Sequence, residues 1–112
     1  MTSFTQNYDS TISKLDDRLS ALIDSGFDFE LEKNGDVLVI IFEDNSKYII
    51  SPNSPVSQLW VSANYEGHRF NFEESKSTWH DEKTGEELLR YLSRLFSEKM
   101  SKSISLSDNT KN

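Results

Sequence analysis

Between residues 27 and 80 the chain alternates short apolar segments with turn-forming residues, and a segment with helical periodicity stands on either side. Successive side chains of a strand point to opposite faces, whereas a helix repeats its apolar residues every three to four positions. Short strands that follow one another through tight turns pair in an antiparallel sheet. The order helix, strands, helix therefore predicts an α+β fold.

We expect about six strands, at residues 27–32, 37–42, 47–50, 58–63, 68–72 and 78–80. Asn34-Gly35 and Asp44-Asn45 are typical of the turns that would join the first three strands. In the first segment three apolar residues alternate with three carboxylates, which predicts one buried and one exposed face. These residues are Phe27, Phe29 and Leu31 on the inner face and Asp28, Glu30 and Glu32 on the outer face.

Two amphipathic helices are expected to cover one face of this sheet. The first spans residues 4–24 and ends at Ser25-Gly26, because glycine readily adopts the left-handed conformation that stops a helix. The second should open at the capping box Thr84-Gly85-Glu86-Glu87. Their apolar stripes are Phe4, Tyr8, Ile12, Leu15, Leu19, Leu22 and Ile23, and Leu88, Leu89, Leu92, Leu95 and Phe96. The sequence thus predicts a two-layer sandwich whose other sheet face meets water.

A chain of 112 residues is of the size of one domain. We place this domain at residues 1–102 and expect residues 103–112 to form a polar, partly disordered tail. The start of the chain has no signal-peptide features, and no apolar run approaches the roughly 20 residues that span a bilayer. There is no cysteine, which excludes disulfides, thiolate metal sites and cysteine nucleophiles.

The formal net charge of −7 arises entirely within the first 44 residues, which hold ten carboxylates and three cations. The remaining residues carry nine charges of each sign. The low pI of about 4.7 argues against binding to nucleic acid or to anionic membranes, whose phosphates would repel the chain. Such asymmetry favours a surface for cations or for a basic partner. The charged surface also favours a monomer.

The predicted acidic ridge combines one edge of the first helix with the outer face of the first strand. Its members are Asp9, Asp16, Asp17, Asp24, Asp28, Glu30 and Glu32. Carboxylates are hard oxygen ligands for Ca²⁺, Mg²⁺, Mn²⁺ and iron. Since the spacing lacks the tight loop of a calcium site, we expect several weak, water-rich cation sites. The alternative is a solvated surface that only aids solubility.

A second candidate site is an outward row on the fourth and fifth strands. It comprises Gln58, Trp60, Ser62, Arg69 and Asn71. An exposed tryptophan among polar residues resembles a protein-binding hot spot, and Arg69 could stack on the Trp60 ring. The alternative, equally open, is that Trp60 lies beneath a loop.

Sequence signals for catalysis are weak. His68 and His80 are not at metal-ligand spacing, so surface or hydrogen-bonded imidazoles are expected. There is no nucleophile elbow and no glycine-rich phosphate loop. We expect a binding protein rather than an enzyme.

Several motifs resemble the frataxin family. They are Pro55-Val56-Ser57-Gln58-Leu59-Trp60-Val61-Ser62, Gly67-His68-Arg69-Phe70-Asn71-Phe72, Thr78-Trp79, Asn34-Gly35-Asp36-Val37-Leu38 and the acidic first helix. The similarity covers residues 4 to about 100 and is greatest to the bacterial CyaY type. It implies a frataxin-like fold and a cytoplasmic bacterial protein of iron–sulfur cluster assembly.

The resemblance also implies weak iron binding on the ridge acids and docking on a cysteine desulfurase and a scaffold protein. Ser20 and Ala21 stand where bacterial relatives often carry a pair of aspartates, so this ridge is thinner, and Ser51 replaces a usual asparagine. In longer family members a C-terminal extension lies between the helices; here we expect Ile104 and Leu106 to give partial cover at best.

Three functions follow from this reading. The chain would bind iron to supply or sense it, or it would be a docking regulator of the desulfurase for which metal binding is incidental. A ferroxidase ranks last, because scattered carboxylates control a redox centre poorly.

Overall fold

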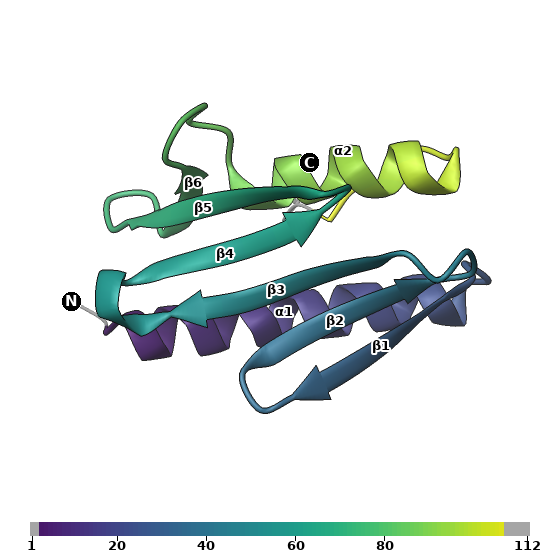
Figure 1. Ribbon diagram of the computed structural model, residues 1–112, viewed down its shortest axis with the longest axis horizontal. Helices are drawn as coiled ribbons and strands as arrows, with labels where there is room; N and C mark the ends of the chain where they lie inside the picture. Colours follow the sequence, from purple (N-terminus) through teal and green to yellow (C-terminus); the bar gives the residue numbers. More distant parts are fainter. Residues whose placement is uncertain (1–2, 107–112) are drawn as a thin grey trace.

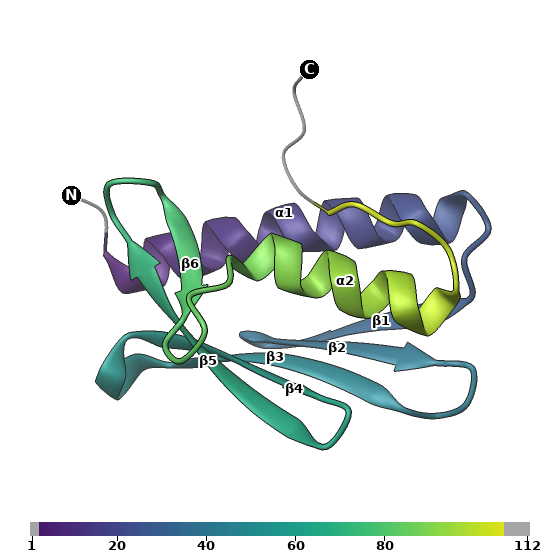
Figure 2. The ribbon, with the colours of Figure 1, turned by 90° about the horizontal axis from the view of Figure 1, so that it is seen from above.

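The computed structural model describes residues 3–106 and confirms the predicted α+β sandwich (Figure 1). The elements are α1 (Phe4–Asp24), β1 (Phe29–Asn34), β2 (Val37–Phe42), β3 (Lys47–Asn53), the short 3₁₀ helix η1 (Ser54–Val56), β4 (Gln58–Ala63), β5 (Glu66–Glu73), β6 (Thr78–Asp81) and α2 (Leu88–Met100). The six strands form one antiparallel sheet in sequence order. Both helices lie on one face of this sheet (Figure 2), and no helix of the described chain is long and apolar enough to cross a membrane.

Helix α1 has the predicted bounds, and a capping box marks its start. The Ser3 hydroxyl accepts a hydrogen bond from the Gln6 amide, and the Gln6 side chain accepts one from the Ser3 amide, both at 3.1 Å. This reciprocal pair is a capping box that satisfies amides left open at a helix start. At the other end Gly26 has a φ of +112°, a conformation that glycine adopts with little strain.

The first hairpin turn lies one residue beyond its predicted place. Asn34 pairs with Val37, so the two loop residues are Gly35 and Asp36. Gly35 takes the positive φ of +61° at the first loop position, which is the glycine position of a type II′ turn. The shifted turn does not change which side chains of β1 face the helices. Phe29 is buried, as predicted for the inner face.

The capping box predicted at Thr84-Gly85-Glu86-Glu87 is wrong. Helix α2 begins at Leu88, and its N-cap is Glu87, whose carboxylate accepts hydrogen bonds from the amides of Leu89 and Arg90. Gly85 has a φ of +79°, and Glu87 forms an isolated β-bridge with His80. The chain after β6 forms a turn at residues 82–84 and stays non-helical up to Glu87, so the helix begins about one turn later than predicted.

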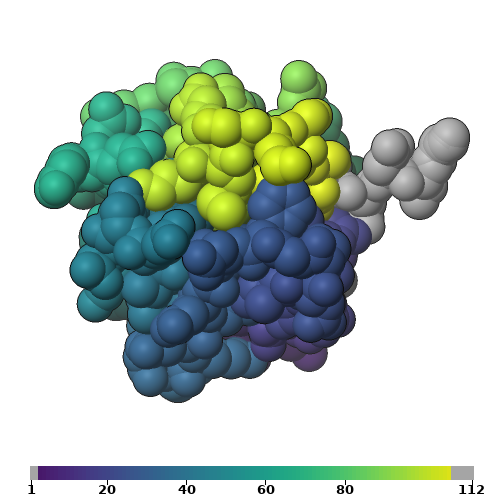
Figure 3. Space-filling view, turned by 90° about the vertical axis from the view of Figure 1, so that its right-hand side faces the viewer, coloured from purple at the N-terminus to yellow at the C-terminus, as the bar shows by residue number. Residues whose placement is uncertain are grey.

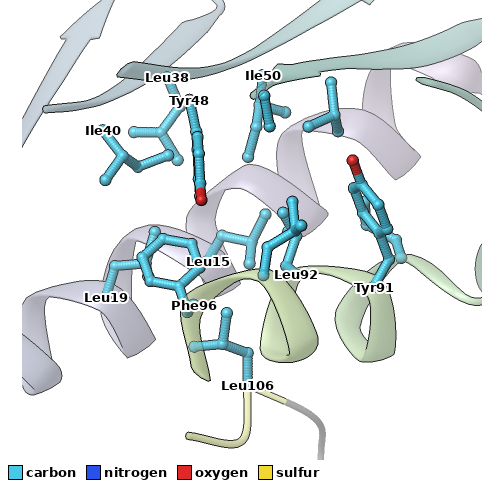
Figure 4. Packing of buried hydrophobic residues seen from close by; sticks show 14 of the residues in the cluster. Leu15, Leu19, Leu38, Ile40, Tyr48, Ile50, Tyr91, Leu92, Phe96 and Leu106 are labelled. Atoms are coloured by element: carbon cyan, nitrogen blue, oxygen red, sulfur yellow. The ribbon is translucent and has the colours of Figure 1, made fainter. Parts of the chain in front are cut away.

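The core lies between the helices and the inner face of the sheet. Figure 4 shows Leu15 and Leu19 of α1 and Leu92 and Phe96 of α2 directed toward Tyr48 and Ile50 of β3. Phe96 also contacts Phe29 and Phe42, with ring centroids 5.6 Å apart in each pair. Aromatic pairs at this separation add to the stabilisation from apolar burial.

The expectation of only partial cover by the C-terminal segment is wrong. Ile104 and Leu106 are 7% and 1% exposed and belong to the core. After α2 the chain turns back and runs between the two helices (Figure 2), and Leu106 points toward Phe96 (Figure 4). Residues 107–112 lie outside the described residues, so their predicted disorder stays a prediction.

Hydrogen bonds from the helices hold this segment in place. The Ser97 hydroxyl accepts from the Ile104 amide at 2.9 Å and donates to its carbonyl at 3.1 Å, and the Ser93 hydroxyl accepts from the Leu106 amide at 2.8 Å. The Arg18 guanidinium donates to the Leu106 carbonyl. The segment thus buries apolar side chains without leaving these backbone groups unsatisfied.

We predict that Leu106→Ala lowers the free energy of unfolding by about 2 kcal/mol, because burial of the leucine is lost and a cavity remains. Urea unfolding followed by circular dichroism would measure the change. Ser105→Ala, at an exposed neighbour, is the control and should stay within about 0.5 kcal/mol. Equal stability of the two variants would contradict the packing described above.

Candidate functional site

The predicted ridge acids lie on the surface at the side of the molecule formed by α1 and β1. Asp16 is half-buried, and the other six acids are exposed. Successive side chains of β1 point to opposite faces, so Glu30 faces outward next to the buried Phe29. Strand β1 forms one edge of the sheet. Figure 3 shows the end of α1 and strand β1 side by side on one face. The ridge therefore runs from the helix layer to the outer face of the edge strand.

The ridge offers oxygen ligands but no ready-made metal cage. Within residues 3–106 no three histidine or acidic side chains converge closely enough to hold a metal ion. The Asp16 carboxylate accepts a hydrogen bond from Ser20 at 3.4 Å. Such exposed single carboxylates suit cations that keep most of their water. The donor set fits weak binding of hard or borderline cations.

The acidic surface continues beyond the predicted residues. Asp28 shares a hollow of about 450 Å³ with Glu43 and Asp44 of the β2–β3 turn. Lys99 of α2 donates to Asp44 at 2.8 Å, and its hydrogen bond, with those from Ser46, holds the pKa of Asp44 below its ordinary range. Sequence reasoning did not find this pair, because its residues lie 55 positions apart.

The predicted outward row on β4 and β5 is brought together by the strand register. Trp60 pairs with Arg69, and Gln58 pairs with Asn71. The Arg69 guanidinium lies 5.0 Å from the centroid of the Trp60 ring, as expected for a cation–π contact. Figure 1 looks onto this open face of the sheet. Ser62 lies on the same strand face and is exposed.

Polar contacts hold Trp60 in one orientation, with its ring half-buried. Its indole Nε1–H donates to Gln58 Oε1 at 3.0 Å, and Gln58 Nε2 donates to Asn71 at 3.2 Å and to Glu82 at 2.9 Å. Glu82 also forms an ion pair with Arg69 at 3.7 Å. Sequence reasoning missed Glu82, which follows β6 and reaches the row only through sheet pairing. The half-buried ring is pre-organised for contact with a partner.

A groove of about 580 Å³ follows the end of β5 that β6 does not cover, and Trp60, Ser62 and Arg69 of the row form part of its lining. Its floor holds Asp81, the one buried charged residue of the described chain, which is 5% exposed. Asp81 Oδ1 accepts from the amides of Lys83 at 2.7 Å and Thr84 at 3.2 Å, and Oδ2 contacts His68 Nδ1 at 2.7 Å. The His68 ring packs on Tyr91 of α2, with centroids 4.8 Å apart.

The contact between His68 and Asp81 shifts the pKa of each residue. Burial would raise the pKa of Asp81, but hydrogen bonds from His68 and from two amides hold it below its usual value. Burial lowers the pKa of His68, but its contacts with Asp81 and Glu66 outweigh this, so the pKa lies above 6.5. A histidine with a raised folded-state pKa stabilises the fold most when it is protonated.

We predict that the stability advantage of the wild type over His68→Gln is largest below pH 6.5 and shrinks as the pH rises through the folded-state pKa of His68. Urea unfolding of both proteins across this pH range, with a metal chelator present, would measure it. Asp81→Asn should remove most of the pH dependence. An advantage that stays constant with pH would contradict the assignment.

Comparisons with known proteins agree with this architecture. A family model described as "Frataxin-like domain" matches residues 1–102. The iron-sulfur cluster assembly protein CyaY of Colwellia psychrerythraea is 34% identical over 87 residues, which are 78% of this chain and 80% of the relative. The protein of the same name from Pseudomonas fluorescens is 38% identical over 90 residues, covering 80% and 79%. The solved frataxin of Psychromonas ingrahamii has a TM-score of 0.82 at 26% identity, covering 94% of this chain and 95% of that structure.

Proposed function

This chain belongs to the frataxin family, and on that premise we propose that it acts in iron–sulfur cluster assembly as an iron-binding protein that docks on the cysteine desulfurase and its scaffold partner. In this role the chain binds iron and partner proteins and catalyses no chemical step itself. Iron would bind on the acidic ridge, and the row around Trp60 would contact the partner proteins. The observation that carries this proposal is that the acidic ridge and the row around Trp60 lie on separate surfaces of one fold.

The charge pattern of α1 supports a use for the ridge beyond solubility. The first turn of this helix has no acidic residue and the last turn has no basic residue. Asp24, the final residue of the helix, therefore faces the negative end of the helix dipole, which is unfavourable by a few tenths of a kcal/mol. Clustered acids also repel one another. An arrangement that opposes stability in two ways favours a role in binding.

Iron would be held weakly and exchangeably on this surface. Fe²⁺ and Fe³⁺ accept carboxylate oxygens, and the ridge supplies these without a closed cage. Weak, water-rich binding suits a protein that passes a cation on or responds to its concentration. Other divalent cations that prefer oxygen ligands should compete for the same residues.

We predict that replacing Asp16, Asp17 and Asp24 by Asn weakens Fe²⁺ binding at least tenfold, because three of the negatively charged oxygen ligands on α1 are lost. An anaerobic titration followed by amide NMR signals would measure the effect. The matched control replaces Glu73, Glu74 and Glu98 by Gln, which removes the same charge outside α1 and β1. Unchanged affinity of the ridge variant would contradict the assignment of iron to the ridge.

The Trp60 row has the chemistry of a protein-binding hot spot. Tryptophan and arginine are enriched among residues that dominate interface energies, and both are held in place here by Gln58 and Glu82. A residue that is already ordered loses little entropy when a partner covers it. The ridge would add long-range attraction for a basic surface of the desulfurase.

We predict that Trp60→Ala weakens binding to the desulfurase–scaffold complex by about 2 kcal/mol, or more than tenfold. Calorimetry with the purified complex would measure it. Tyr65→Ala is the matched control, since Tyr65 is a fully exposed aromatic on the turn after β4. Losses of equal size in both variants would contradict a special role for Trp60.

The second candidate is a docking regulator for which metal binding is incidental. The absence of a convergent ligand set within residues 3–106 is the observation that favours it. Under this alternative the ridge triple variant should lose desulfurase binding even in iron-free buffer, and wild-type binding should weaken steeply with salt. Docking that depends on bound iron and is insensitive to salt would instead support the first function.

A further inference from the structure

The two histidines of the chain, which no sequence motif distinguishes, have different surroundings. His80 Nδ1 lies 3.1 Å from the Gly85 carbonyl oxygen, and His80 Nε2 lies 2.8 Å from the Thr78 hydroxyl. A neutral imidazole satisfies both contacts, donating to the carbonyl and accepting from the hydroxyl. His80 Nε2 is thus engaged by the Thr78 hydroxyl, and the Glu73 carboxylate oxygen lies farther from it, at 3.9 Å.

His68 is held differently, by a buried carboxylate. Asp81 Oδ2 lies 2.7 Å from His68 Nδ1, and Asp81 Oδ1 is occupied by the Lys83 and Thr84 amides. A carboxylate accepts hydrogen bonds only, so Nδ1 must carry a proton. The ring is also fixed by its packing on Tyr91. In the neutral imidazole the lone pair is consequently on Nε2.

That lone pair faces a second acceptor. His68 Nε2 lies 3.3 Å from Glu66 Oε1. Two acceptors at this distance repel each other unless a positive species lies between them, either a proton or a metal cation. Glu66 has a side chain that is 73% exposed, so the position is open to the groove and to solvent.

We infer that His68 Nε2 and the Glu66 carboxylate form a binding site for a divalent first-row transition cation such as Zn²⁺, with Asp81 as the positioning residue. Nitrogen and oxygen ligands about 2.0–2.1 Å from Zn²⁺ at the tetrahedral angle lie about 3.4 Å apart. The observed separation of 3.3 Å is close to this spacing. A histidine whose other nitrogen donates to a carboxylate is the usual arrangement for a metal-bound imidazole.

This site is separate from the acidic ridge in place and in chemistry. It lies at the free end of β5 beside α2, whereas the ridge lies on α1 and the edge strand β1 at the other side of the sheet. Its imidazole selects borderline transition cations, while the ridge carboxylates also accept Mg²⁺ and Ca²⁺. With two protein ligands, the other coordination positions are left to water or to a donor from a bound partner. The inference does not depend on the proposed function.

The test is a Zn²⁺ titration of the intact protein in excess Mg²⁺, which occupies oxygen-only sites. Side-chain ¹H–¹⁵N NMR spectra would follow the ring nitrogens of both histidines. The Nε2 signal of His68 should move with Zn²⁺, and the signals of His80 should not. His68→Gln should lower the affinity at least tenfold and His80→Gln should leave it unchanged. Asp81→Asn should lower it 10- to 100-fold, as for other carboxylates that orient a metal-bound histidine.

Glu66→Gln keeps the test valid if Asp81→Asn does not fold, because Glu66 is exposed. It should weaken Zn²⁺ binding severalfold while the protein stays folded. If the His68 signals respond to pH but not to Zn²⁺, a proton alone occupies the position and the inference fails. Equal shifts at His68 and His80, or full Zn²⁺ affinity in His68→Gln, would also overturn it.

Discussion

The burial of one face of the sheet against two helices is the constraint on which the rest of this structure depends. Leu38, Ile40 and Ile50 are fully buried against α1 and α2, with Phe96 at the centre of the aromatic contacts. Because side chains alternate along a strand, this burial forces every intervening residue outward. A slip of one residue in β4 would bury Trp60 and expose Leu59. The outward face is therefore as firmly specified as the core.

Charge is distributed so that the two ends of the sheet differ. The α1–β1 side concentrates carboxylates, and near it Lys99 neutralises Asp44 while Arg18 donates to the C-terminal segment. On the β5–β6 side acids and bases are paired, as Arg69 with Glu82 and Arg94 with Glu86. The excess of carboxylates on the α1–β1 side suits the weak binding of exchangeable cations and the long-range attraction of a basic partner. The ion pairs on the β5–β6 side instead hold their side chains in fixed positions. The same sheet thus supports two surfaces of different physical character.

The C-terminal segment links the two helices, which contact the sheet separately. Ser93 and Ser97 of α2 and Arg18 of α1 bind its backbone, while Ile104 and Leu106 complete the core between them. The sequence did not predict that this segment completes the core, because it has only two apolar side chains among polar residues. Two leucine-sized side chains are nevertheless a substantial part of the stability of a small domain, which is on the order of 5–15 kcal/mol.

Periodicity by itself determined α1, the apolar stripe of α2, the strand order and the inner face, because local pattern and the burial of apolar area specify these together. It did not determine where α2 begins. It also predicted the acids of the ridge and aligned Trp60 with Arg69 on one strand face, but it left open whether Trp60 lies beneath a loop. Only the tertiary structure decided which distant groups meet. Glu82 joins Trp60 and Arg69, Lys99 pairs with Asp44, Leu106 enters the core, and Asp81 orients His68 toward Glu66. These contacts depend on strand pairing and chain reversal across tens of residues, and no local signal in the sequence records them.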